Sequence, residues 1–482
     1  MKPFMTAESP QSCWQTGLAT SVIEEHDVCL DIEGKLPEAL QGTLYRNGPG
    51  RFELGGIHKQ HLLDGDGMIQ AIEFANGNVR YRNRFVRTPK YLLESQAGRF
   101  VLPTWSTLAP GGILANFGNR IKCQAGVTIV PKHGKLYAFD EVALPFVLDP
   151  DSLDTLGPEQ VGSPGLSVDY KAHTKTDPQS GEWLILGVEQ GRRLHLHLAE
   201  HGTDGRLLRT QRVCAPRSAY FHDWFATENY VVVSLQPLQV SFWRFLSGLS
   251  SYIDSMRWRP EQGNLLMIID RNAAKSPVII DAPARFMWHS LNAYEHGNTI
   301  VADYVGYDAP DHFIGENAAF RAVMQQRCGL AQHVGQVRRY LIDLDKKTVS
   351  DETISPLNHE FPIISPAVAL GPHRYGYFTT APQATVFHNG LARVDMQTGD
   401  RQAFYMNDKT HLGEPIYVAD SNATDEQGWL LSVGLNGETG KSFLGIFASH
   451  HLSDGPQAIV NLDCPMPLSF HGWWHSVRST TY

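Results

Sequence analysis

The sequence predicts an all-β protein and, within that class, a β-propeller. From about residue 128 onward, short segments rich in Val, Ile, Leu, Tyr and Phe follow one another, separated by clusters of Gly, Pro, Asn and Asp. The 43 Gly and 28 Pro supply the many tight turns that such a chain needs. A β-sandwich rarely absorbs 482 residues and no linker divides the chain, so we expect one propeller domain over residues 1–482.

The strands are predicted from their composition and from the turn residues that flank them. In chain order they are 134–141, 183–189, 193–200, 230–236, 264–270, 276–282, 298–305, 338–345, 375–381, 429–435 and 443–449. A similar sequence pattern recurs at 147–155, 341–350 and 393–401. Each copy is typical of an edge strand followed by an Asp-containing turn and a return strand. Such hairpins at irregular intervals are typical of propeller blades.

Composition and charge exclude several classes of protein. The net charge of −9 argues against a nucleic-acid partner, because phosphate binding needs a basic face. The six cysteines contain no CxxC pair, so neither a disulfide framework nor a thiolate zinc site is indicated. The first residues lack the apolar core of a signal peptide and there is no run of about 18 apolar residues, so we expect a cytoplasmic protein, soluble or peripheral on a membrane surface.

Four histidines differ from the others in their surroundings. His173, His222, His289 and His471 each stand beside aromatic, aliphatic or small residues at one end of a strand-like segment. They are far apart in sequence, but a propeller brings the inner strand of every blade to one axis, where imidazoles from different blades can surround one metal. Taken singly, each is more typical of a buried histidine with ordinary partners.

His195 and His197 are a weaker candidate pair for metal binding. They lie two residues apart and therefore on one face of a strand, where two imidazoles can share a metal. We interpret them as part of a solvated strand face.

Three stretches near the N-terminus are distinctive: "LPEALQGTLYRNGPGRFE" (36–53), "HLLDGDGMIQAIEF" (61–74) and "RNRFVRT" (82–88). They resemble the N-terminal signatures of the carotenoid cleavage oxygenases. The resemblance continues in the family's order through "FHDW", "HSLNAYE", "EFP" and "GEPIYV" to the terminal "FHG". It covers essentially the whole chain.

The resemblance implies a seven-bladed β-propeller with a helical and loop cap over an axial site that holds one Fe(II) per chain, with O₂ as co-substrate. The four iron-ligand positions of the family fall on His173, His222, His289 and His471. The carboxylates that orient those rings in the family fall on Glu141, Glu360 and Glu414. In this interpretation the C-terminal strand delivers the fourth ligand.

Four further positions bear on the substrate. The resemblance places Leu63 and Trp288 in the wall of the substrate tunnel. Counting back from Glu141 without a gap places Val127 where apocarotenoid-cleaving members commonly carry the Thr of "NTN". Asp140 occupies the place of the lysine that holds a phenol in the lignostilbene-cleaving branch, which disfavours a phenolic substrate.

The function implied is cleavage of one conjugated C=C bond of a lipophilic polyene, a carotenoid or apocarotenoid, into two aldehyde or ketone products. A stilbene-cleaving oxygenase is the alternative enzyme, and a propeller that isomerises or only binds a retinoid or carotenoid is the alternative of another class. No obligate protein partner is indicated.

A membrane contact is expected through residues 240–258. On a helix this segment would place Phe242, Phe245, Leu246, Leu249, Tyr252 and Ile253 on one face. Residues 100–118 add to the same apolar patch. The other interpretation is a helix buried against the propeller.

Overall fold

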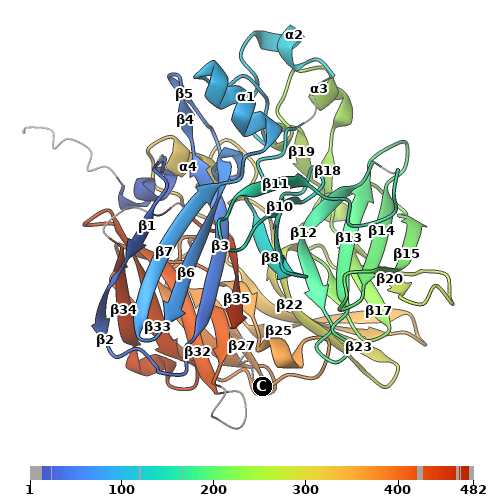
Figure 1. Cartoon of the computed structure of the whole chain (residues 1–482). Coiled ribbons are helices and arrows are strands. Elements are labelled where there is room, and N and C mark those ends of the chain that lie inside the picture. Colours follow the sequence, from blue (N-terminus) through green and yellow to red (C-terminus); the bar gives the residue numbers. More distant parts are fainter. Residues whose placement is uncertain are drawn as a thin grey trace, which may run out of the picture.

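The computed structural model describes residues 13–22, 24–118, 121–165, 167–420, 427–462, 466 and 468–476. Seven antiparallel sheets stand around a common axis, and the chain is a seven-bladed β-propeller with few helices (Figure 1). The predicted fold class is confirmed, and each predicted strand segment contains a strand. The architecture matters for function because the innermost strands of different blades contact one another at the axis.

The first three blades are formed as follows, from the axis outward. The first contains β35 (His471–Ser476), β3 (Gly42–Arg51), β6 (Asp66–Ala75), β7 (Asn78–Phe85) and β1 (Asp27–Cys29). The second contains β8 (Thr128–Lys132), β9 (Lys135–Phe139), β10 (Phe146–Leu148) and β11 (Thr155–Pro158). The third contains β12 (Asp169–Thr176), β13 (Trp183–Glu189), β14 (His195–His201) and β15 (Leu207–Cys214).

The other four blades repeat this plan. The fourth contains β16 (Phe225–Ala226), β17 (Tyr230–Leu235), β20 (Asn264–Asp270) and β21 (Val278–Ala282). The fifth contains β22 (Phe286–His296), β23 (Thr299–Tyr307), β24 (Gln336–Asp343) and β25 (Thr348–Ser355). The sixth contains β26 (His359–Ile363), β27 (Tyr375–Thr380), β28 (Gly390–Asp395) and β29 (Arg401–Tyr405). The seventh contains β30 (Thr410–Leu412), β31 (Ile416–Ala419), β32 (Gly428–Asn436), β33 (Lys441–Ala448), β34 (Pro456–Leu462) and β2 (Asp31–Gly34).

Segments far apart in sequence close the ring. The antiparallel pairing of β35 with β3 places His471 opposite Asn47 and Ser476 opposite Gly42. In the seventh blade, β2 pairs with β34. The ring is thus closed by two sheets that each combine strands from both halves of the chain.

The hydrophobic core is distributed between neighbouring blades. Leu186 and Leu196 of the third blade pack with Val231 and Val233 of the fourth, and all four side chains are buried. Apolar residues on these strands therefore hold blade against blade, which fixes the relative positions of the inner strands.

Four short helices form a cap over one end of the propeller (Figure 1). They are α1 (Pro89–Ala97), α2 (Gly112–Asn116), α3 (Phe242–Leu246) and α4 (Ala319–Met324), and the hairpins β4–β5 (Glu53–Leu54, Ile57–His58) and β18–β19 (Leu238–Val240, Met256–Trp258) accompany them. At α1, Thr88 accepts a hydrogen bond from the Tyr91 amide and Pro89 stands in the first turn, as the start of a helix favours.

The predicted long helix over 240–258 is wrong. Helix α3 ends at Leu246, because Gly248 adopts a left-handed φ of +75° and lies against the backbone of α2. A Cβ at Gly248 would lie 2.7 Å from the Ile113 carbonyl oxygen, so only glycine allows this close approach. Ile253 is buried and Tyr252 is half-buried, both apart from the exposed face of α3.

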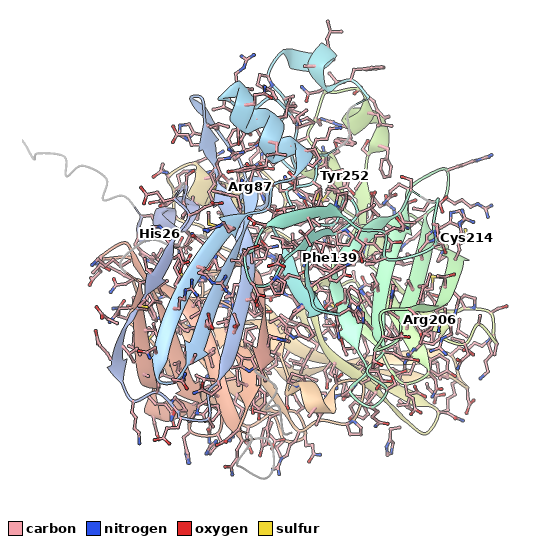
Figure 2. The ribbon with its side chains drawn as sticks, in the orientation of Figure 1. His26, Arg87, Phe139, Arg206, Cys214 and Tyr252 are labelled. Carbon is pink, nitrogen blue, oxygen red and sulfur yellow. A yellow bond between two sulfur atoms is a disulfide. The ribbon has the colours of Figure 1, made fainter. Side chains whose placement is uncertain are left out.

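The cysteines also differ from expectation. Cys13 and Cys328 form a disulfide, which the absence of a CxxC pattern did not indicate. Cys29, Cys123 and Cys214 are free thiols, and Figure 2 shows Cys214 on the outer edge of the third blade.

Within the described part of the chain, no helix is long and apolar enough to cross a membrane.

Candidate metal centre

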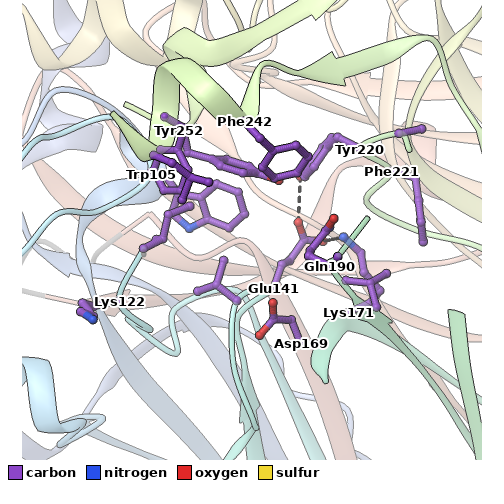
Figure 3. A pocket seen from close by; sticks show the side chains of 17 residues that line it. Trp105, Lys122, Glu141, Asp169, Lys171, Gln190, Tyr220, Phe221, Phe242 and Tyr252 are labelled. Carbon is purple, nitrogen blue, oxygen red and sulfur yellow. Dashed lines mark hydrogen bonds and ion pairs between the residues drawn. The ribbon is translucent and has the colours of Figure 1, made fainter. Parts of the chain in front are cut away.

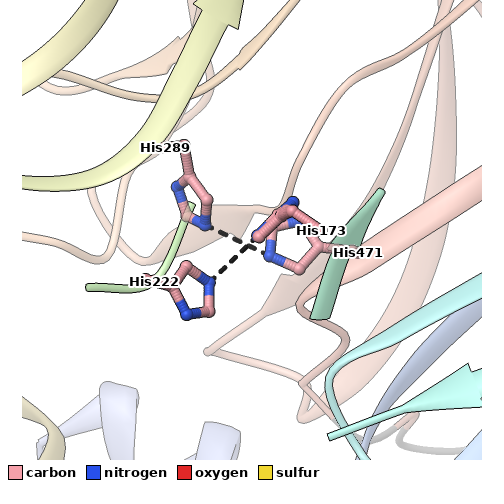
Figure 4. A group of neighbouring side chains, drawn as sticks. All are labelled: His173, His222, His289 and His471. Carbon is pink, nitrogen blue, oxygen red and sulfur yellow. Dashed lines mark hydrogen bonds between the residues drawn. The ribbon is translucent and has the colours of Figure 1, made fainter. Parts of the chain in front are cut away.

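The four predicted histidines converge on the propeller axis (Figure 4). His173 lies on β12, His222 precedes β16, His289 lies on β22 and His471 begins β35. The strand register shifts between Tyr170 and Thr174 in β12 and between Met287 and Ser290 in β22. These irregularities bracket His173 and His289, and bulges of this kind redirect a side chain next to a site.

The ring nitrogens are close enough to share one cation. The Nε2 atoms of His173 and His222 are 3.0 Å apart, and those of His289 and His471 are 3.2 Å apart. One nitrogen from each of the four rings lies within 4.8 Å of the other three. Converging imidazole nitrogens are characteristic ligands of transition metals, so the donor set fits a metal ion.

Three carboxylates fix the orientation of three of the rings. The Nδ1 atom of His222 lies 2.8 Å from Glu141 Oε1, that of His289 lies 2.6 Å from Glu360 Oε2, and that of His471 lies 2.9 Å from Glu414 Oε1. Because the Nδ1 atom of each of these rings faces a carboxylate, Nδ1 carries the proton and Nε2 keeps a lone pair for a metal. Glu141, Glu360 and Glu414 thus occupy the places that the resemblance implied.

Burial favours the neutral form of three of the four histidine rings. Burial lowers the pKa of His222 to about 4, and burial together with the other three rings lowers that of His173 well below its ordinary value. Burial likewise lowers the pKa of His471. At His289, burial lowers the pKa but the Glu360 carboxylate outweighs it, so the net shift is upward. Neutral imidazole is the form that binds a metal.

Glu141 has two further partners, neither of which was predicted from the sequence. The Lys171 ammonium lies 2.9 Å from its Oε1, and the Tyr220 hydroxyl donates to its Oε2 at 2.8 Å (Figure 3). Burial raises the pKa of Glu141, but Lys171 and His222 outweigh this and lower it to about 2. The signal available in the sequence was that Lys171 lies two residues before His173 on the same strand.

An apolar cavity adjoins the metal centre. It is narrow, with a volume of about 50 Å³, and His222, His289 and His471 form part of its wall. Leu63, Val127, Trp288, Phe320, Phe361, Val386, Phe387, Leu468 and Phe470 supply the apolar part of its wall. The predicted tunnel residues Leu63, Val127 and Trp288 are therefore brought together beside the rings of His222, His289 and His471.

A second and larger cavity lies between the cap and the propeller (Figure 3). Its volume is about 540 Å³. Trp105, Phe242, Phe245 and Tyr252 of the cap form an aromatic side, whereas Glu141, Asp169 and Lys171 form a charged side. Glu141 thus lines this cavity and also contacts the ring of His222.

Asp140 does not line either cavity. Its Oδ2 accepts the Gln124 amide at 2.9 Å, and its Oδ1 accepts the Glu141 amide at 2.8 Å. Burial raises its pKa to about 6. The expected contact of Asp140 with substrate therefore stays a prediction; what its carboxylate does in this structure is fix the loop that positions Glu141.

The sequence pattern described as "retinal pigment epithelial membrane protein" matches residues 19–476. The chain belongs to this family. It is 28% identical to apocarotenoid-15,15'-oxygenase of Synechocystis over 98% of both chains. It is also 28% identical to isoeugenol monooxygenase of Pseudomonas putida, over 94% of this chain and 96% of that one.

Solved structures agree with the assignment of the family. Cobalt-substituted Synechocystis ACO superposes with a TM-score of 0.91 at 27% identity, over 97% of this chain and 99% of that one. The chain is therefore a member of a family of cleavage oxygenases, in which the resemblance seen in its motifs extends to the whole fold.

The metal ligands can be tested one at a time. Replacing His173, His222, His289 or His471 by Ala removes one of four donors, so bound iron should fall from about one per chain to near zero. Elemental analysis of protein purified with iron measures this. His195→Ala and His197→Ala are the matched controls, and iron retained at full occupancy in His471→Ala would contradict the assignment.

Removing one of the three carboxylates should weaken metal binding without abolishing it. Glu141→Gln, Glu360→Gln and Glu414→Gln keep the shape but remove the charge, so metal affinity measured by chelator competition should fall roughly 10–100-fold. Three variants with unchanged affinity would show that the carboxylates do not support the metal.

Glu141→Gln should carry an additional cost because it leaves buried Lys171 without a counter-charge. Breaking a buried ion pair typically costs about 3–5 kcal/mol of stability. Adding Lys171→Met should restore the melting temperature but not the metal affinity. A double variant that recovers neither would mean that the Lys171 charge is not what destabilises the single variant.

Proposed function

We propose that this protein is an iron-dependent oxygenase that splits a conjugated C=C bond of an apocarotenoid or carotenoid with O₂, giving two aldehyde or ketone products. The observation that carries the proposal is the opening of the four-histidine centre onto a narrow apolar cavity. The similarity of the chain to apocarotenoid-15,15'-oxygenase over nearly its whole length supports the same reaction.

His173, His222, His289 and His471 would hold one Fe(II) per chain, and four ligands leave positions free for O₂. The bound iron would supply the O₂ chemistry. The chain's own residues bind and orient the substrate: the aromatic and aliphatic side chains around Trp288 exclude water and hold a flat conjugated chain beside the ligands. No protein acid or base is required by this arrangement.

One observation favours a second candidate, a phenolic alkene of the kind named in isoeugenol monooxygenase. The sequence argument against phenols was that Asp140 replaces a cation, but the structure has Lys171 and Tyr220 in the wall of the larger cavity. Both side chains are already bonded to Glu141, so the Lys171 charge is compensated. For this reason we keep the polyene as the first candidate.

Substrate preference distinguishes the two candidates. The apolar lining of the narrow cavity suits an apolar conjugated segment better than a phenol, so kcat/KM for an apocarotenal should exceed that for a 4-hydroxystilbene at least roughly tenfold, or about 1.4 kcal/mol. Product analysis by chromatography after incubation of the iron-loaded protein measures both. Faster cleavage of the stilbene would overturn the polyene proposal, and conversion to an isomer without cleavage would favour an isomerase.

Trp288→Ala should lower the rate of apocarotenal cleavage without releasing iron, because the Trp288 ring lines the cavity 4.8 Å from the ring of His222. Iron content and rate are measured on the same sample. Loss of iron together with activity would make Trp288 a support of the metal centre instead.

We also propose that the cap contacts a membrane surface. Leu114, Phe117 and Trp243 are 92%, 71% and 68% exposed, and Leu92 and Leu249 are also exposed. Figure 1 shows α1, α2 and α3 at the same end of the molecule, and the Gly118 amide donates to the Leu246 carbonyl at 2.7 Å. Exposed apolar side chains gathered in this way are typical of membrane or protein contacts.

The membrane contact is tested by Leu114→Ser, Phe117→Ser and Trp243→Ser combined. Each inserted apolar side chain is worth roughly 1.5–3 kcal/mol, so liposome co-sedimentation should fall strongly while iron content stays unchanged. The matched control replaces Leu156, Leu207 and Leu208, which are exposed on outer strands. Equal liposome binding by the wild type and the cap variant would exclude this surface.

A further inference from the structure

The wall of the narrow cavity contains a hydrogen-bond acceptor without a donor. His411 lies on β30 and its side chain is buried, with 4% of the residue exposed. Its Nδ1 atom is 3.1 Å from the carbonyl oxygen of His388, which also accepts the Leu412 amide at 2.8 Å. Its Nε2 atom has no hydrogen-bond partner among the residues that the structure describes.

The chemistry of this ring is fixed by its surroundings. Burial lowers the pKa of His411 to about 3, so the imidazole is neutral. Because Nδ1 faces a carbonyl oxygen, Nδ1 carries the single proton and Nε2 presents a lone pair. A buried acceptor that no donor reaches destabilises the fold, and native proteins rarely retain one without a reason.

The nearby His388 is a buried histidine whose two ring nitrogens both have hydrogen-bond partners. Its Nδ1 lies 2.6 Å from the Thr379 hydroxyl, and its Nε2 lies 3.0 Å from the Thr385 carbonyl oxygen. His388 therefore has a partner at each nitrogen. His411, 23 residues further on, has one partner only, the carbonyl oxygen of His388 at its Nδ1.

The unpaired acceptor is connected to the metal centre by a row of aromatic rings. The ring of His411 is 6.3 Å from that of Phe387, which is 6.2 Å from that of Phe320. The Phe320 ring lies 6.4 Å from Trp288, and Trp288 lies 4.8 Å from His222. His411 thus belongs to the same cavity wall as the ligands His222, His289 and His471.

We propose that His411 is a specificity-determining residue that accepts a hydrogen bond from a hydroxyl group of the substrate. The inference rests on the proposed cleavage of a conjugated C=C bond beside the four histidines, and it adds that the substrate carries a hydroxyl on the part that occupies this cavity. An aldehyde or ether oxygen has no proton to donate, so neither satisfies the Nε2 lone pair. The hydroxyl can belong to the end ring of a hydroxylated apocarotenoid or to a phenol.

The test compares pairs of ligands that differ by one hydroxyl. One pair is an apocarotenal with and without a hydroxyl on its end ring, and the other is 4-hydroxystilbene and stilbene. Kd is measured by quenching of tryptophan fluorescence in metal-free protein, and kcat/KM by product formation in iron-loaded protein. The wild type should prefer the hydroxylated member of one pair at least about tenfold in both quantities, because the apolar analogue leaves the acceptor unpaired.

Three variants separate this role from a structural one. His411→Phe keeps the ring but removes the acceptor, and His411→Asn keeps a donor toward the His388 carbonyl but does not reach into the cavity. Both should lose the preference for the hydroxyl. His411→Gln places an amide oxygen near the Nε2 position and should retain part of it. His195→Phe, at the half-buried first residue of β14 and outside the lining of the narrow cavity, is the matched control and should keep the wild-type preference.

The outcomes are distinguishable from failure of the proposed function. If no alkene is cleaved, the proposed function is wrong, and the Kd ratios in metal-free protein still decide the role of His411. A wild type that does not discriminate in either pair, or a His411→Phe variant that discriminates as the wild type does, would overturn the inference. Should His411→Phe fail to fold, the Asn and Gln variants make the same comparison. The pair that shows the effect identifies the source of the hydroxyl.

Discussion

The antiparallel pairing of β35 with β3 is the interaction on which the rest of the structure depends. It closes the ring of blades and at the same time brings His471 to the axis. Arg46 on β3 reinforces the closure from a fully buried position: it donates to the Glu414 carbonyl at 2.9 Å and to the Ser469 carbonyl at 3.2 Å. The first blade, the seventh blade and the last ligand are thus fixed together.

Buried charge imposes the second constraint. Three carboxylates surround four mostly neutral rings, and a buried carboxylate is unfavourable without a counter-charge. Lys171 is paired with Glu141, and Arg46 lies 3.9 Å from Glu414. Glu360 contacts the His289 ring and the Phe361 amide, which are not permanent cations. A divalent metal among the rings would supply the positive charge that this side of the site lacks, which is a physical reason for expecting a metal there.

The sequence carried the class of fold because strand composition and turn residues are local properties. Seven blades, the four ligands and the three glutamates followed only from the family resemblance, since imidazoles that are 49, 67 and 182 residues apart form no local pattern. Lys171, Tyr220 and His411 were not predicted, because their roles depend on contacts between different blades. The helix over 240–258 was overestimated because the approach of Gly248 to α2, a tertiary contact, ends it.

The central claim is that one iron ion occupies the space between the four histidine rings. Anomalous diffraction at the iron absorption edge, from crystals of the protein grown with iron, tests it most directly. The account predicts one strong anomalous peak per chain, within bonding distance of the Nε2 atoms of His173, His222, His289 and His471. The absence of a peak there, or a dominant peak elsewhere in the molecule, would contradict it.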